Sequence, residues 1–291
     1  MEMTDLQLSL RQEITDESIA AGNVQDSILL SVCDPYSFQY AVFDTQRNKI
    51  IALRDYRVHS GNDEFQPGFF QQIFAKDNLL AKIRPAKKYI SFFPSCNVLV
   101  PGPLFSRENA IDFLNLSSSA PQVFSYHDKL RFADINLVYG LPGFLITEFE
   151  SQLGEVSTHN ALTAFIDQQL MNSKHNTNKM LAVNVRQNNM DIVVTDGASL
   201  LFSNTFVWQH AEDFIYYLLF TMEQLQMNPD QDDVTMFGEI DKTSATWLVS
   251  RKYIRNVNPG QRPEGAEYSY GFSKLGAHQY YSLFSQQLCV S

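Results

Sequence analysis

The stretch LAVNVRQNNMDIVVTDGASLLFSNTFVW, from Leu181 to Trp208, predicts three short β-strands joined by two tight turns. Its three runs are rich in β-branched and aromatic residues, which favour strands, and Asp196-Gly197 between the second and third runs is a hairpin-turn sequence. The first turn, Arg186 to Asn189, contains no glycine. Glycine is needed wherever a backbone must approach a phosphate closely, because a side chain blocks that approach. The composition of this turn therefore bears on function as well as on fold.

The same pattern occurs earlier in the chain, in ILLSVCDPYSFQYAVFDTQRNKIIALRDYRV, residues 28–58. Both stretches read as strand, turn, strand, turn, strand, so the chain contains an internal repeat of an antiparallel meander. The corresponding runs are Ile28–Val32 and Met180–Val185, Phe38–Phe43 and Met190–Val194, and Ile50–Leu53 and Leu200–Ser203. Asp44-Thr45 and Asp196-Gly197 form the equivalent second turns.

Each meander is followed by the same two elements. Apolar residues recur at helical spacing between Phe69 and Ile83 in the first half and between Phe214 and Leu225 in the second. A further apolar strand then follows, at Lys88–Phe93 and at Asp233–Phe237. Each half is therefore predicted to be β-β-β-α-β, with the helix crossing back onto the sheet.

This order predicts an α/β chain made of two tandem ribonuclease H-like units, with mixed sheets and helices on their faces. We place the first unit at residues 25–120 and the second at 121–291, because the polar stretch Ser117 to Asp128 is the best boundary. The second unit is expected to carry an inserted strand and helices near 130–172, with one helix beginning near Ser157. Asn256–Gly271 is expected to be irregular, and Ala277–Leu288 to form a closing helix.

The chain also resembles a known group of proteins. The segments that carry the resemblance are LLSVCDPYSFQYAVFD at 29–44, VLVPGPLF at Val98–Phe105, LVYGLP at Leu137–Pro142 and the ending at Cys289. In their order and spacing they resemble an uncharacterised domain-of-unknown-function family of Bacteroides-type bacteria that has an actin-like ATPase fold. The likeness spans roughly residues 25–291, and more distantly the duplication is similar to the cell-division actin homologue and the pilus-assembly protein of that superfamily.

Charge and composition exclude several classes of function. The formal net charge of −10 argues against a nucleic-acid partner, because binding phosphates needs clustered Lys and Arg. Met1–Gly22 lacks the apolar core of a signal peptide, and the longest apolar run, Phe214–Met222, is far shorter than the ~20 residues of a membrane span. We therefore expect a cytoplasmic protein. Cys33, Cys96 and Cys289 show no paired spacing and are expected to be packed side chains.

The resemblance implies where a nucleotide would bind. In ATPases of this fold, the turn after the first strand of each half carries Asp and Gly and contacts phosphates, and a glycine-rich turn after the last strand holds adenosine. Here the first turn, Cys33–Ser37, keeps Asp34 but has Pro35, which lacks an N–H donor. The second turn, Arg186–Asn189, has neither residue type, and the third retains one glycine, Gly238, among carboxylates. Asp34 and Gly238 are thus the candidate cofactor-binding residues if a nucleotide binds.

Other catalytic patterns are absent from the sequence. A two-metal nuclease would need converging carboxylates, whereas Asp44 and Asp196 are explained as hairpin-turn residues. The six histidines have no metal-ligand spacing, and His210 reads as the residue that begins a helix. We therefore predict no catalytic residues and no metal site. Exposed aromatic residues mark protein interfaces, and Tyr253 to Tyr270 is a candidate surface of that kind.

These observations lead to one function and one alternative. The first is a non-catalytic, degenerate ATPase (a pseudo-ATPase) that binds an unidentified protein partner and needs no cofactor. The alternative is a divergent Mg-dependent ATPase or kinase that binds ATP in the cleft between the halves and uses Asp34 for magnesium. A metal-dependent nuclease ranks behind both. The sequence specifies no oligomeric state.

Overall fold

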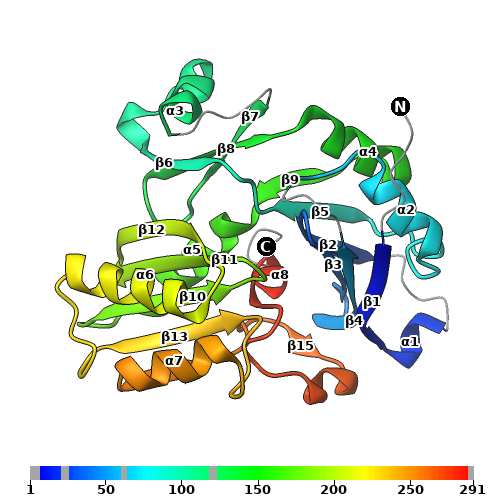
Figure 1. Cartoon of the computed structure of the whole chain (residues 1–291). Helices are drawn as coiled ribbons and strands as arrows, with labels where there is room; N and C mark the ends of the chain where they lie inside the picture. The colour runs from blue at the N-terminus through cyan, green and yellow to red at the C-terminus, as the bar shows by residue number, and fades with distance from the viewer. Residues whose placement is uncertain (1–6, 21–25, 60–63, 118–122, 288–291) are drawn as a thin grey trace.

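The structure is a computed structural model that describes residues 7–20, 26–59, 64–117 and 123–287. Two sheet-based units lie side by side, with a smaller inserted sheet above them in the view of Figure 1. The predicted closing residues at 288–291, including Cys289, lie outside the described part of the chain, as does the predicted unit boundary at 120/121.

The first unit is built on a seven-stranded sheet of order β1-β4-β3-β2-β5-β9, with β15 paired to β4. Its strands are β1 (Gln7–Thr15), β2 (Ser27–Asp34), β3 (Ser37–Asp44), β4 (Lys49–His59), β5 (Lys87–Phe92), β9 (Ser157–Asn160) and β15 (Glu267–Tyr268). Strands β2, β3 and β4 form the predicted antiparallel meander. Strand β5 pairs with β2, and β9 pairs with β5, both in the parallel direction. Every residue of β2 is buried because helices cover both faces of this strand.

The second unit repeats this plan in a five-stranded sheet of order β12-β11-β10-β13-β14. Its strands are β10 (Lys179–Val185), β11 (Asn189–Asp196), β12 (Ser199–Val207), β13 (Asp233–Gly238) and β14 (Asn256–Pro259). The order matches β4-β3-β2-β5-β9 position for position, with the last two strands parallel in both sheets. The internal repeat seen in the sequence therefore extends to five strands of each sheet, and the first sheet adds β1 and β15.

An inserted unit lies between β5 and β9 in the chain. Its three-stranded antiparallel sheet has the order β6-β8-β7, from Asn97–Pro101, Ile135–Leu141 and Phe124–Lys129 respectively. It also contains η1 (Gly102–Leu104), η2 (Arg107–Asn109) and α3 (Ala110–Ser117). Small buried side chains such as Cys96, Val100 and Leu114 form its core.

Helices cover both faces of each large sheet. In the first unit, α2 (Phe69–Lys76) and α4 (Gly143–Leu153) pack on one face, and η3 (Tyr270–Lys274) and α8 (Tyr281–Phe284) on the other. In the second unit, α6 (Ala211–Gln224) and α7 (Ala245–Tyr253) cover one face and α5 (Ala161–Ser173) the other. The short α1 (Glu17–Ala20) follows β1.

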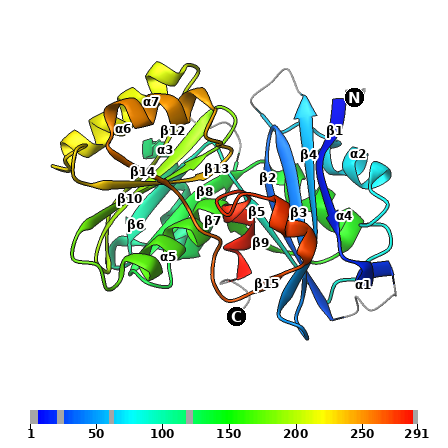
Figure 2. The same ribbon diagram turned by 90° about the horizontal axis from the view of Figure 1, so that it is seen from below.

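The C-terminal segment, which we define as residues 278–287, lies between the two units (Figure 2). Leu283 and Phe284 pack into the core of the first sheet, while the Tyr281 ring packs against Phe237 and Phe165 of the second unit, with ring centroids 4.0 Å and 5.8 Å apart. This one segment thus contributes to the cores of both units. The predicted helix at Ala277–Leu288 is much shorter than expected, since α8 spans only Tyr281–Phe284.

Several strands differ from the sequence-based expectation, including β7, which lies in the stretch predicted as a polar boundary, and β15, which lies in the stretch predicted as irregular. Ser157–Asn160 is the strand β9, and the helix predicted near Ser157 begins only at Ala161. Asn256–Pro259 is the strand β14 rather than irregular chain, and the polar N-terminal region contributes β1. Because β9 pairs with β5, the chain returns to the first sheet at residues 157–160, after the inserted strands and α4.

Candidate functional site

The β2–β3 turn of the first unit and the β10–β11 turn of the second unit face one another across the cleft between the units. In the β2–β3 turn, Asp34 is buried, and its Oδ1 accepts hydrogen bonds from the Tyr36 N–H (2.8 Å) and the Ser37 hydroxyl (3.1 Å). This is an Asx turn, in which the carboxylate stabilises its own hairpin. Burial raises the pKa of Asp34, although the charge of Arg186 opposes that shift. Asp34 is thus oriented by its own turn.

The β10–β11 turn carries Arg186 where a phosphate-binding turn would carry glycine. Its guanidinium donates to both oxygens of Asp191, from Nε at 3.0 Å and Nη2 at 2.8 Å, and lies 4.0 Å from the centroid of the Phe93 ring. Asp191 is fully buried and also accepts from Asn184 Nδ2 (2.9 Å) and the Thr205 hydroxyl (2.7 Å). Burial by itself would lower the pKa of the Arg186 guanidinium, but the Asp191 carboxylate has the opposite effect, and the net result is a raised pKa. The cationic group is therefore fully engaged within the protein.

The third predicted element, Gly238, ends β13 at the same cleft. Its φ is 85°, and a Cβ there would lie 2.2 Å from the Val185 carbonyl oxygen, so glycine is required by the close approach of β10. Its N–H donates to the His278 carbonyl at 2.9 Å, and the His278 Nε2 donates to the Ile240 carbonyl at 2.8 Å. The backbone donor that a ligand would use is bonded to the C-terminal segment.

Charged side chains that the sequence did not single out join the two units. Glu239, next to Gly238, pairs with Arg57 of β4 and with Arg11 of β1, the latter at 3.2 Å. Arg57 also donates to Gln187 Oε1 at 3.1 Å, which connects β4 with the turn of the second unit. Burial by itself would lower the pKa of the Arg57 guanidinium, but the nearby Glu239 carboxylate raises it, and the net result is a raised pKa. Glu239, one of the carboxylates beside Gly238, is thus neutralised by two arginines.

The C-terminal segment supplies the last contact of the cleft. Tyr280 adopts the left-handed conformation (φ 57°), and its hydroxyl donates to Asp55 Oδ2 at 3.0 Å. Asp55 is fully buried on β4, and burial raises its pKa against the opposing charges of Arg57 and Arg11. Burial also raises the pKa of Tyr280, next to the Asp55 carboxylate. Tyr280 therefore remains a protonated donor at neutral pH and holds the segment against the first unit.

Asp34 and Gly238 both line the cavity that remains in this cleft, so the structure brings the two sequence-predicted residues together. The cavity measures about 50 Å³. Sites for small molecules are roughly 300–1,000 Å³, whereas one water occupies about 30 Å³. In this conformation the cleft has room for water but not for a nucleotide.

The other sequence candidates lie elsewhere. Asp44 accepts N–H bonds from Gln46 and Arg47 within its own hairpin turn, as predicted, and His210 precedes the first residue of α6 in a capping box with Asp213. Cys33 and Cys96 are both buried. Within the described ranges, no group of three His, Cys, Asp or Glu side chains is arranged to hold a metal ion.

The tyrosines of the predicted aromatic surface do not form one patch. Tyr253 ends α7 and is half exposed, whereas Tyr270 begins η3, which contacts β1 of the first unit. Tyr268 is partly buried, and its ring packs against Phe272 and Phe284.

Comparisons with known proteins now place this architecture. Residues 16–257 match the family described as "Protein of unknown function (DUF3822)". The chain belongs to this family. None of the curated proteins matches it in sequence.

Solved structures show the fold. A Bacteroides thetaiotaomicron VPI-5482 protein described as having an actin-like ATPase fold and unknown function superposes with a TM-score of 0.72 at 18% identity, covering 82% of this chain and 92% of that one. The PilM–PilN type IV pilus biogenesis complex matches with a TM-score of 0.56 at 12% identity, covering 90% and 96%. The predicted actin-like fold and family resemblance are therefore confirmed. In the described part of the chain, no helix has the length and apolar character needed to cross a membrane.

Proposed function

We propose that this chain is a non-catalytic protein of actin-like fold, a degenerate ATPase that acts as a scaffold or protein-interaction module and needs no nucleotide. The observation that carries the proposal is that the cleft between the units is closed by the protein's own groups. Arg186 is paired with Asp191, the Gly238 N–H with the His278 carbonyl, and Glu239 with two arginines. To admit a phosphate, the protein would have to break several of these buried contacts at once.

Exposed aromatic side chains support a role in protein binding. On the outer face of α6, Tyr216 is 61% exposed and Phe220 is 44% exposed, and their rings stack with centroids 6.0 Å apart. Tyr217 and Phe206 extend this row toward β12. Aromatic residues are enriched at protein interfaces, and the structure of similar fold that contains PilM is a complex with PilN. The net charge of −10 supports a protein rather than a nucleic acid as partner.

The decisive experiment is a thermal unfolding series with millimolar ATP or ADP, with and without Mg²⁺. A ligand present at 100 times its Kd adds about 2.7 kcal/mol to the free energy of unfolding, which raises Tm by several degrees for a chain of this size. We expect no change in Tm. A shift that requires Mg²⁺ and disappears in Asp34→Ala would instead support the Mg-dependent ATPase and overturn the proposal.

An ATP hydrolysis assay tests catalysis directly, beside the test of nucleotide binding. We expect the wild-type chain and Asp34→Ala to release phosphate from ATP at the same background rate. Asp44→Ala, which removes the Asx-turn carboxylate of the other hairpin, is the control for general effects of losing such a turn. A rate lost in Asp34→Ala and kept in Asp44→Ala would contradict the proposal.

A further inference from the structure

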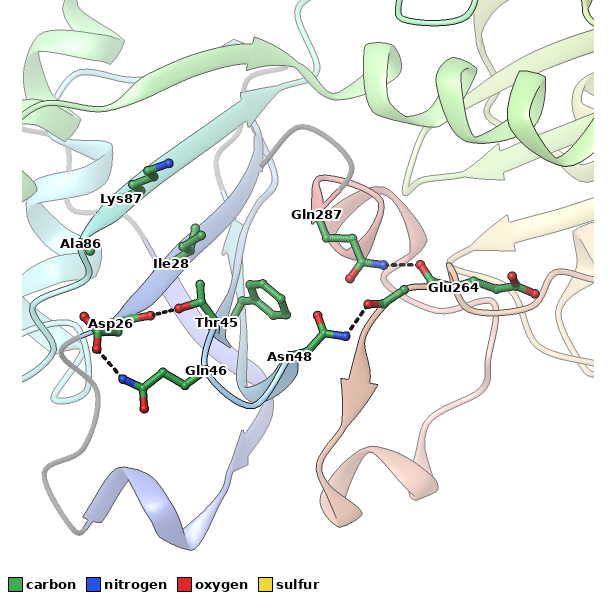
Figure 3. A pocket seen from close by; sticks show the side chains of 11 residues that line it. Asp26, Ile28, Thr45, Gln46, Asn48, Ala86, Lys87, Glu264 and Gln287 are labelled. Atoms are coloured by element: carbon green, nitrogen blue, oxygen red, sulfur yellow. Dashed lines mark hydrogen bonds between the residues drawn. The ribbon is translucent and has the colours of Figure 1, made fainter. Parts of the chain in front are cut away.

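A second, much larger cavity lies at the hairpin turn between β3 and β4. It measures about 570 Å³ and shares no lining residue with the cleft. Its walls come from the hairpin turn, from the beginnings of β2 and β5, and from the C-terminal part of the chain at Glu264, Gly265 and Gln287 (Figure 3). Its volume lies within the range of sites that bind small molecules.

One side of this cavity is apolar. Ile28 of β2 and Phe43 of β3, both largely buried, border it together with Ala86. An aromatic ring at this position offers both apolar contact and the negative face that attracts a cation.

The hydrogen-bond donors of the hairpin turn are already used within the protein. The Thr45 hydroxyl donates to the Asp26 carbonyl at 2.6 Å, and Gln46 Nε2 donates to Asp26 Oδ2 at 2.5 Å. Asn48 Nδ2 donates to the Gly265 carbonyl at 2.7 Å. On the opposite wall, Gln287 Nε2 donates to the Glu264 carbonyl at 2.8 Å.

The carboxamide oxygens of Asn48 and Gln287 are the acceptors that remain at this wall. Because each of the Asn48 and Gln287 amide nitrogens bonds to a carbonyl, which can only accept, the orientation of both carboxamides is fixed. Gln287 Oε1 is buried and has no hydrogen-bond partner in the described part of the chain. Figure 3 shows that oxygen and the Asn48 oxygen directed toward the space between these two side chains. A buried acceptor without a donor is costly, so this wall favours a ligand that brings a hydrogen-bond donor.

The charges at the rim favour the same chemistry. Asp26 lies on the cavity side, and its second carboxylate oxygen has no bond to a described residue. Lys87 is the one cation among the lining residues and is exposed, and the Glu264 carboxylate points away from the cavity in Figure 3. An anionic ligand would meet carboxamide and carboxylate oxygens, whereas a cation with N–H groups would satisfy them.

We propose that this cavity binds a small organic cation that carries at least two N–H donors on an apolar body, such as an amidinium, a guanidinium or a primary ammonium. The N–H groups bond to Asn48, Gln287 and Asp26, and the apolar body lies against Ile28 and Phe43. This site is independent of the cleft, so it stands or falls separately from the proposal that the protein is a degenerate ATPase.

The test uses three probes of the same shape: benzamidine, benzamide and benzoate, titrated into the full chain and followed by the ¹H–¹⁵N signals of the Asn48 and Gln287 side-chain amides. A probe of this size binds with a Kd of roughly millimolar order. We expect benzamidine to bind at least ten times more tightly than benzamide, and benzoate to cause no saturable shift. Equal binding of the three probes, tighter binding of benzoate, or no saturable shift with benzamidine would overturn the proposal.

Two substitutions at the rim, each of which removes one negative charge, form a matched pair. Asp26→Asn removes the carboxylate on the cavity side and is expected to raise the Kd of benzamidine about three- to tenfold, because one opposite charge at contact distance is lost in a partly exposed site. Glu264→Gln makes the same change in charge on a side chain that points away, and it is expected to leave the Kd within twofold. An equal effect of the two would show that only the overall charge matters and would overturn the site.

Lys87→Met gives a change of opposite sign. Removing the single cation at the rim is expected to lower the Kd of benzamidine, because a like charge disappears while the apolar stem remains. A rise in the Kd of benzamidine, or a loss of benzoate binding where benzoate binds the wild type, would assign the cavity to an anion instead.

Discussion

The cleft between the units and the cavity at the β3–β4 hairpin contain similar polar side chains but use them differently. In the cleft, Arg186, Glu239 and Tyr280 each bond to a partner within the chain, and a cavity of about 50 Å³ remains. In the hairpin cavity, the amide donors are used but the acceptors are not, and about 570 Å³ remains open. The place where this fold holds a nucleotide in its ATPases is thus the better filled of the two.

The two regions use polar groups of one duplicated architecture in different ways. Asp34 and Gly238 line the space between the two sheets, and the C-terminal segment and Arg186 bond to the protein groups around it. The contacts that close the cleft should therefore contribute strongly to stability, and those around the hairpin cavity should contribute little. The following predictions test that difference.

The largest effect is expected from Asp191→Ala. This variant leaves the Arg186 guanidinium, which is largely buried, without its bidentate partner and removes the acceptor for Thr205, so the free energy of unfolding should fall by about 3–5 kcal/mol. Denaturant unfolding followed by circular dichroism measures the change. The double variant Arg186→Met with Asp191→Ala should lose clearly less, because no unpaired charge remains; an equal or greater loss would mean that the ion pair does not close the cleft.

Gly238→Ala should rank second. A Cβ at this position meets the Val185 carbonyl oxygen at 2.2 Å, and its backbone is also in the left-handed region, so we expect a loss of about 2–4 kcal/mol. Gly197→Ala is the control. Its φ is 55°, but the nearest atom is the Asn176 carbonyl oxygen at 3.6 Å, so only the backbone cost of about 1 kcal/mol applies. Equal losses would refute a close approach of β13 to β10.

Asp167 is a buried carboxylate outside both sites, and the pH dependence of the free energy of unfolding measures what its burial costs. Burial raises the pKa of Asp167 from its ordinary value to about 6, although its carboxylate accepts the Phe132 and Arg131 N–H groups. A folded-state pKa above the unfolded value favours the protonated form in the folded protein, so this contribution is fully present below pH 4 and is lost as the pH rises through 6. We expect the free energy of unfolding contributed by Asp167 to fall by on the order of 3 kcal/mol over this range.

Asp167→Asn cannot titrate and should therefore unfold with a smaller decrease in stability between pH 4 and pH 7. Denaturant unfolding of the wild type and of this variant at matched pH values measures the difference. Parallel pH profiles would show that Asp167 keeps an ordinary pKa in the folded protein.

Much of the fold follows from local sequence patterns. The two meanders were predictable because their strands are long and apolar and their turns contain residues such as Asp44 and Gly197, whose chemistry specifies a turn. The strands β9 and β14 were not, because STHN and NVNP are short and polar and become strands only by pairing beside β5 and β13. Their pairing is a tertiary effect that no local pattern contains.

The candidate site residues came from the family resemblance, which implied the turns after β2 and β13. The structure places Asp34 and Gly238 of those turns on one cavity. Arg11 and Arg57 lie far from Glu239 in the sequence, so their pairing with it could not be inferred from spacing. Arg186 and Asp191 lie on either side of one predicted turn, and their opposite charges were a signal that could have been used.

The smallest effect is expected from Asp34→Asn, compared with Asp44→Asn. Asparagine keeps the Asx-turn acceptor in both hairpins and removes only the charge. Because burial raises the pKa of Asp34, its charge is disfavoured in the folded cleft, and its removal at pH 7 should leave the free energy of unfolding unchanged or raise it by up to about 1 kcal/mol. Asp44→Asn gives up only an exposed contact with Arg47 and should lower stability by at most about 1 kcal/mol. A loss above about 2 kcal/mol in Asp34→Asn alone would mean that attraction between the Asp34 carboxylate and Arg186 holds the two turns together, and the cleft would then depend on the same carboxylate that an ATPase would need for magnesium.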